Sequence, residues 1–109
     1  MAIHELVQAV ADHPMAALHG ESAQERELVA LGAAAVPLIA EALRPGRLQA
    51  SGDWRDIYDA LCAVLVQIAA HHESTVRELL DDHTLNGNVG VVTWALSEAA
   101  RIRSLRSGA

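Results

Sequence analysis

The sequence predicts an all-α fold built from antiparallel helical hairpins, and two observations lead to that prediction. Between Glu27 and Leu43, an apolar helix end is followed by glycine, small residues and a proline early in a second helix. Half of the residues are hydrophobic, yet Phe is absent, so the core must consist of Ala, Leu, Val and Ile. That mixture favours close helix packing over a β-sandwich. At 109 residues, the chain should form one domain, residues 1–109.

The N-terminal segment predicts a short amphipathic helix from Ile3 to Ala11, ending before His13 and Pro14. Its apolar residues share one helical face, namely Ile3, Leu6, Val7 and Val10. Met15–Leu18 should add one further turn, because Gly20 then breaks the helix.

A second helix is expected after Ser22, which is spaced from Glu25 as in a capping box. Gly32 should stop that helix after Leu31. A third helix, from about Ala35 to Leu43, carries Pro37 in its first turn, where a missing backbone N–H costs little.

Three further helices are expected in the second half of the chain. Asp53 is a candidate cap for the long helix Trp54–Ala70, which is apolar nearly all round in its latter half and should form the centre of the core. Thr75–Glu78 has the spacing of another capping box, opening a short helix through Asp82. The last helix should run from Asn88 or Val89 to about Leu105 and bury Val92, Ala95, Leu96, Ala99 and Ile102.

Apolar positions repeat at an offset of 40 residues, which is within the period of about 40–47 residues typical of HEAT and armadillo arrays. The pairs at this offset are Leu28 and Ile68, Val36 and Val76, and Ile39 and Leu79. The repetition favours helical hairpins that stack on one another.

The segment Ala30-Leu31-Gly32, followed by Ala35-Val36-Pro37-Leu38-Ile39 and Leu43, resembles the HEAT repeat, including its bacterial phycobilisome-lyase-like branch. The resemblance implies a short α-solenoid of antiparallel hairpins, with about five or six helices at this length. It also implies a surface that holds other macromolecules, without a catalytic residue belonging to the repeat. Arg77 departs from the family pattern, which would offer proline there.

Charge and cysteine content narrow the function classes. A net charge of −6, with eight arginines and no lysine, disfavours nucleic-acid binding and suits a protein partner with a basic surface. The single cysteine, Cys62, excludes an internal disulfide and a cysteine-based zinc cluster, which favours a reducing, cytoplasmic setting. No secretory signal is evident, and the longest uncharged run, Ala60–His72, is too short to span a bilayer.

No residue pattern predicts catalysis, a cofactor or a metal site. His71 and His72 are adjacent, so their side chains diverge by about 100° on a helix and cannot chelate one ion together. We expect them at a helix end, where imidazole can meet free carbonyls. A composite site from the other histidines stays open. Cys62 lies among apolar residues without a cationic neighbour, as is typical of a buried, unreactive thiol.

Two sets of residues are candidates for partner binding. Trp94 lies on the same flank of the last helix as Glu98 and Arg101, away from the apolar stripe. The tryptophan is either exposed as a binding residue or covered by another segment, and the sequence favours neither. The second set is acidic and comprises Asp56, Asp59, Asp81 and Asp82, within a longer acidic run that also includes Asp53, Glu73 and Glu78.

Positive charge gathers in the last helix, at Arg101, Arg103 and Arg106. It either compensates the helix dipole or supports head-to-tail or twofold self-association through acidic and basic ends.

The sequence therefore predicts a non-catalytic protein-interaction module, an adaptor or scaffold, with an acidic helical surface. A small acidic immunity or antitoxin protein that neutralises a basic toxin is the alternative. A small enzyme with a site between helical hairpins is the least favoured hypothesis.

Overall fold

The computed structural model describes residues 2–20, 22–44, 52, 54–81, 85 and 88–107. Every regular element within these ranges is a helix, so the predicted all-α class is confirmed. The Cα radius of gyration is 13.2 Å, close to the value of about 13 Å expected for a compact domain of some 100 residues. The expected cap at Asp53 and the residues Asp82 and His83 lie outside the described ranges.

The first two helices follow the sequence pattern closely. Helix α1 spans Ile3–Asp12 and buries Leu6, Val7 and Val10 on one face. Helix α2, Pro14–Leu18, starts with its proline in the first turn, where no intrahelical bond is lost. The predicted short amphipathic helix and the added turn are both confirmed.

Helix α3 (Ala23–Leu31) begins at the expected cap, but only half of the capping box forms. The Ser22 hydroxyl accepts a hydrogen bond from the Glu25 backbone N–H at 3.1 Å. The Glu25 side chain does not return to the cap. Instead it is 5% exposed and accepts a hydrogen bond from Gln67 Nε2 at 2.6 Å. The hydrogen bond from Gln67 on α6 therefore holds the carboxyl group away from the helix start.

The corner between the next two helices is tighter than expected. Gly32 has φ +65° and ψ −134°, a conformation that side chains with a Cβ rarely adopt. It opens the 3₁₀ turn η1, Gly32–Ala35, and helix α4 follows over Val36–Ala42. Pro37 lies in the first turn of α4, as predicted. The third helix thus starts with a separate 3₁₀ turn rather than running directly from Ala35.

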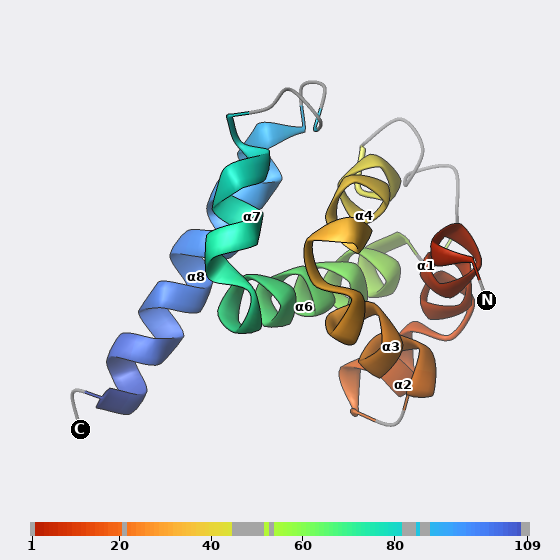
Figure 1. Cartoon of the computed structure of the whole chain (residues 1–109). Coiled ribbons are helices and arrows are strands. Elements are labelled where there is room, and N and C mark those ends of the chain that lie inside the picture. Colours follow the sequence, from red (N-terminus) through yellow and green to blue (C-terminus); the bar gives the residue numbers. More distant parts are fainter. Residues whose placement is uncertain are drawn as a thin grey trace.

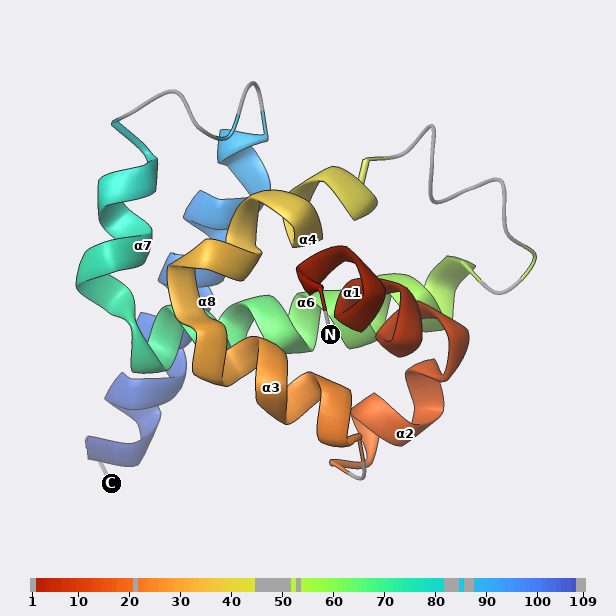
Figure 2. The same cartoon turned by 45° about the vertical axis from the view of Figure 1, so that its right-hand side comes forward.

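Helix α6 (Trp54–His71) is the central element of the fold, as the apolar run predicted. It packs against α1, α2, α3 and α4 on one side of the molecule and against two C-terminal helices on the other. Figures 1 and 2 show this long green helix running through the middle of the molecule, from the N-terminal helices toward α7 and α8. Its buried residues include Ala60, Leu61, Val64, Leu65 and Ile68, all fully inaccessible to solvent.

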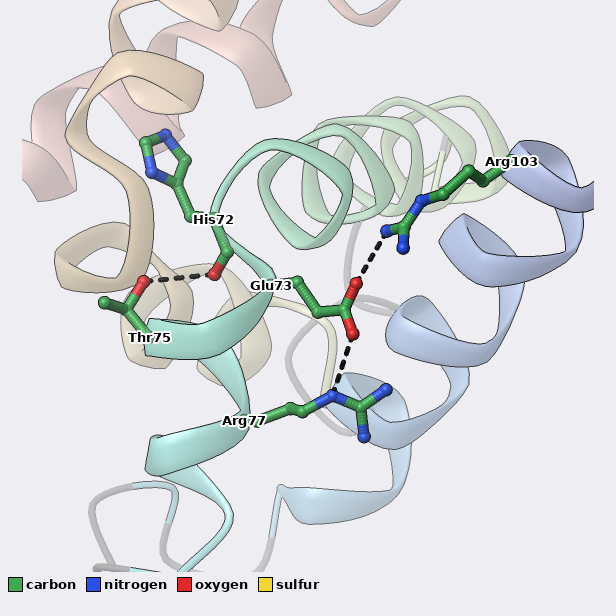
Figure 3. Close-up of polar contacts among 5 residues, drawn as sticks. All are labelled: His72, Glu73, Thr75, Arg77 and Arg103. Carbon is green, nitrogen blue, oxygen red and sulfur yellow. Dashed lines mark hydrogen bonds and ion pairs between the residues drawn. The ribbon is translucent and has the colours of Figure 1, made fainter. Parts of the chain in front are cut away.

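Helix α7 (Glu73–Leu79) begins two residues before the predicted cap at Thr75, so that prediction was wrong. The residue between α6 and α7 is His72, and the Thr75 hydroxyl donates to the His72 carbonyl at 3.0 Å (Figure 3). The threonine lies inside the first turn because α7 starts immediately after α6. The helix ends at Leu79, and Leu80 and Asp81 form a turn, so the predicted helix was too long at this end.

Helix α8 (Val89–Ser107) runs two residues past the predicted end and packs against α6, α7 and α4. It buries Val92, Ala95, Leu96 and Ala99 as expected, whereas Ile102 is only half-buried. Helix α8 lies along one edge of the molecule in the view of Figure 1. None of the helices in the described ranges has the length and apolarity needed to cross a membrane.

Candidate interaction surfaces

The exposed flank of α8 contains three of the predicted partner-binding residues. Trp94 is 44% exposed, which answers the question that the sequence left open. Arg101 donates from Nε to both carboxylate oxygens of Glu98 at 3.2 Å, and its Nη2 also donates to Oε1. This hydrogen bonding lowers the pKa of Glu98 and raises that of Arg101. The flank therefore carries an exposed aromatic ring and an ion pair in which two guanidinium nitrogens bond to one carboxylate.

One residue of the same flank was not predicted as part of the site. Leu105 is 64% exposed, the largest value among the exposed large hydrophobic residues. It lies three turns beyond Trp94 on the same side of a regular helix. We call Trp94, Glu98, Arg101 and Leu105 the α8 strip. The sequence signal for Leu105 is its spacing from Trp94, which places both residues on one side of a regular helix.

The predicted acidic residues lie elsewhere. Asp56 and Asp59 are exposed in the first turns of α6, and Asp81 is exposed just after α7. A carboxylate near a helix N-terminus interacts favourably with the helix dipole, so Asp56 also stabilises α6. None of the three forms an ion pair with another described residue. Asp82 lies outside the described ranges.

The structure does not bring these acids and the α8 strip into one site. The first turns of α6 lie on the side of α1 and α2, whereas α7 and α8 pack near the opposite end of α6 (Figures 1 and 2). The candidates divide into an acidic surface at Asp56 and Asp59, a separate acid at Asp81, and the α8 strip.

Glu73, which was predicted within the acidic run, forms ion pairs with two arginines. Its Oε1 accepts from Arg77 Nε at 3.1 Å and its Oε2 accepts from Arg103 Nη2 at 2.7 Å (Figure 3). The bond from Arg103, followed by that from Arg77, lowers the pKa of the Glu73 carboxyl. The ion pair between Glu73 and Arg103 joins the start of α7 to α8. Because their charges compensate each other, Glu73 adds little to an acidic surface and Arg103 adds little to a basic one.

The two adjacent histidines have different environments, and one of them joins two helices. His72 Nε2 lies 3.0 Å from the Val29 carbonyl oxygen, in the last turn of α3. Both histidines lie at the end of α6, as predicted. The carbonyl that His72 contacts, however, belongs to α3 and not to the end of α6. His71 is exposed. Within the described ranges, no three His, Cys, Asp or Glu side chains are grouped to hold a metal ion.

Cys62 is buried in α6, with 5% of its surface exposed. Burial raises the pKa of its thiol, while a hydrogen bond with Tyr58 acts in the opposite direction. A raised pKa leaves less thiolate near neutral pH, which is the reverse of what a nucleophilic cysteine needs. The predicted burial of this thiol is confirmed.

Comparison of the chain with protein-family models, curated proteins and solved structures finds no match. Its function is therefore inferred from its own residues.

Proposed function

We propose that this chain is a HEAT-like helical module that binds another protein through an acidic surface without catalysing a reaction. The observation that supports it most is the exposure of Asp56 and Asp59, neither of which has an ion-pair partner among the described residues. Together with a net charge of −6, they favour encounter with a basic surface.

Equivalent features of the two hairpins support the HEAT-like part of the proposal. Helix α3 ends at Leu31 and α6 ends at His71, at the offset of 40 residues seen in the sequence. Two of the three pairs at this offset agree in burial, because Leu28, Ile68, Val36 and Val76 are all at most 1% exposed. In the third pair, Ile39 is fully buried and Leu79 is half-buried. Helix α3 packs beside α6, and α7 packs against the η1 corner. The packing of α3 beside α6 is what neighbouring units of a stack would show, and it supports the proposal. Helix α4, in contrast, packs against α6 and α8.

The corners themselves also meet. The His72 ring lies next to Gly32, its counterpart 40 residues earlier, so that a Cβ on Gly32 would be 3.0 Å from the ring. In a stack of repeats, equivalent positions of adjacent units lie side by side. This contact therefore supports assigning α3–α4 and α6–α7 as successive units.

The test is affinity capture from the native host, followed by mass spectrometry, with matched variants. Asp56→Asn/Asp59→Asn removes the proposed surface, and Glu27→Gln/Glu78→Gln removes the same charge from exposed positions on α3 and α7. We expect the first variant to recover at least about tenfold less of a basic partner, equivalent to 1.4 kcal/mol. The control should recover as much as the wild type.

Binding should also weaken as salt is raised, because exposed charges are screened over about 8–10 Å at physiological ionic strength. Equal capture by all variants, or a partner without a basic surface, would contradict the proposal. Recovery of a single partner that is toxic when expressed alone would favour the immunity or antitoxin alternative, which uses the same acidic surface.

A further inference from the structure

The α8 strip has the spacing of a helix-pairing seam. Its members follow one another at intervals of four, three and four residues, and therefore fall within an arc of about 60° on a regular helix. The same alternation keeps residues on the contact side of two helices that pack side by side. Three of its members are well exposed, since Trp94, Leu105 and the Arg101 side chain are 44%, 64% and 59% exposed.

The α8 strip is complementary to a second copy of itself that runs in the opposite direction. Read from Trp94, it is apolar, acidic, basic and apolar. If two α8 helices pack antiparallel, Glu98 of one copy faces Arg101 of the other, and Trp94 faces Leu105. A parallel alignment would place Glu98 against Glu98 and Arg101 against Arg101, which is unfavourable. The charge pattern therefore selects a second copy of this chain in the antiparallel direction.

The position of α8 leaves this seam accessible. The opposite side of the helix is buried, with Val92, Ala95 and Ala99 at most 3% exposed. The helix lies along one edge of the molecule, and its C-terminal end projects beyond α7 (Figure 1). A twofold partner can therefore approach along the helix without meeting the N-terminal helices.

The existing ion pair is arranged so that it can be extended between copies. Arg101 uses Nε and Nη2 for Glu98 of its own helix, and its Nη1 has no partner among the described residues. A guanidinium has five N–H donors, so one arginine can bridge two carboxylates. In the antiparallel pair, each Arg101 would contact Glu98 of both copies, between two Trp94–Leu105 contacts that shield the charges from water.

We propose that the α8 strip mediates twofold, antiparallel self-association of this chain. The occupant of the strip is a second copy, and this contact is separate from the acidic surface at Asp56 and Asp59. A single helix pair buries less area than the roughly 1,200–2,000 Å² of stable interfaces. The dimer is therefore weak and dependent on concentration.

Sedimentation velocity of the full chain, at concentrations up to about 1 mM, measures the dissociation constant directly. Glu98→Arg and Arg101→Glu each oppose like charges across the seam, and each should weaken dimerisation at least about tenfold. Mixing these two variants restores both opposite-charge pairs, so the mixture should form a heterodimer. The double exchange Glu98→Arg/Arg101→Glu should dimerise alone, like the wild type.

Two further variants distinguish a loss of contacts at the α8 strip from general effects of charge or folding. Glu78→Arg makes the same charge change on the exposed surface of α7 and should leave dimerisation unchanged. Trp94→Ala should weaken it, while circular dichroism and the melting temperature stay close to the wild type, because the ring is largely outside the core.

A wild type that stays monomeric throughout the concentration range would overturn the proposal. Failure of the mixed variants to associate, with both chains folded, would do so as well. Neither result bears on the acidic surface, since capture of a basic partner is tested with Asp56 and Asp59 and with the α8 strip intact.

Discussion

His72 and Val29 join the ends of two helices that are far apart in the sequence. His72 Nε2 is 3.0 Å from the Val29 carbonyl oxygen, and because a carbonyl only accepts, Nε2 carries the proton. The backbone of His72 also closes α6 and opens α7, through bonds from its N–H to Ile68 O and from Val76 N–H to its carbonyl. One residue thus fixes the turn between two helices and anchors that turn to a third.

His72→Ala should therefore destabilise the fold by about 1–3 kcal/mol, through the lost hydrogen bond and the cavity beside Gly32. Denaturant unfolding measures this change. His71→Ala is the matched control, because His71 is adjacent but exposed, and its effect should stay within about 0.5 kcal/mol. Equal effects of the two substitutions would show that the contact with Val29 contributes nothing.

Gly32→Ala should be destabilising for two separate reasons. The positive φ strains any residue with a Cβ, at a cost of about 1–3 kcal/mol. The new Cβ would also lie 3.0 Å from the His72 ring. In the double variant with His72→Ala, the steric part disappears, so the two free-energy changes should sum to more than the measured total. Additive effects would indicate strain alone. Gly90→Ala, a helical position with open space, should not destabilise.

Glu73→Gln should change how stability depends on pH. Its native pKa lies below the ordinary value of 4.5, so the folded state favours the charged form. The resulting stabilisation is present above that ordinary value and is lost as the pH falls through the lower native pKa. Melting temperatures of wild type and variant should differ near neutral pH and converge in acid. Glu78→Gln, also on α7 but without an ion pair among the described residues, should show no such convergence.

Gln67→Ala should cost about 1–2 kcal/mol although Gln67 lies at the surface, because its amide is the hydrogen-bond donor to buried Glu25. The other carboxyl oxygen of Glu25 is buried without a partner in the described part of the chain. The control is Gln8→Ala, since the side-chain partner of Gln8 in the described part of the chain is exposed Asp12 in the same helix. A loss for Gln67→Ala no larger than for the control would mean that Glu25 does not depend on that amide.

Alkylation of the Cys62 thiol should be slow in the native protein. Burial limits access, and the raised pKa reduces the thiolate fraction at any given pH below it. The rate should rise with denaturant in parallel with unfolding, as followed by mass spectrometry of the iodoacetamide product. Modification as fast as that of an unfolded control, in the absence of denaturant, would contradict the described burial.

The order of the helices and most of their bounds could be predicted from the amino-acid sequence. The spacing of Leu6, Val7 and Val10, the glycine at Gly32 and the proline at Pro37 act locally, so helix faces and ends could be read from neighbours within a few residues. Burial of the apolar centre of α6 was likewise evident from its composition.

The partners of the polar side chains depend on how the helices pack and could not be predicted from the sequence. Glu25 bonds to Gln67, 42 positions away, and not to its predicted cap. Glu73 pairs with Arg103 on another helix. The exposure of Trp94 was also undecided, because it depends on whether another segment covers the outer face of α8. These outcomes follow from distances between helices, and no local pattern of residues encodes such distances.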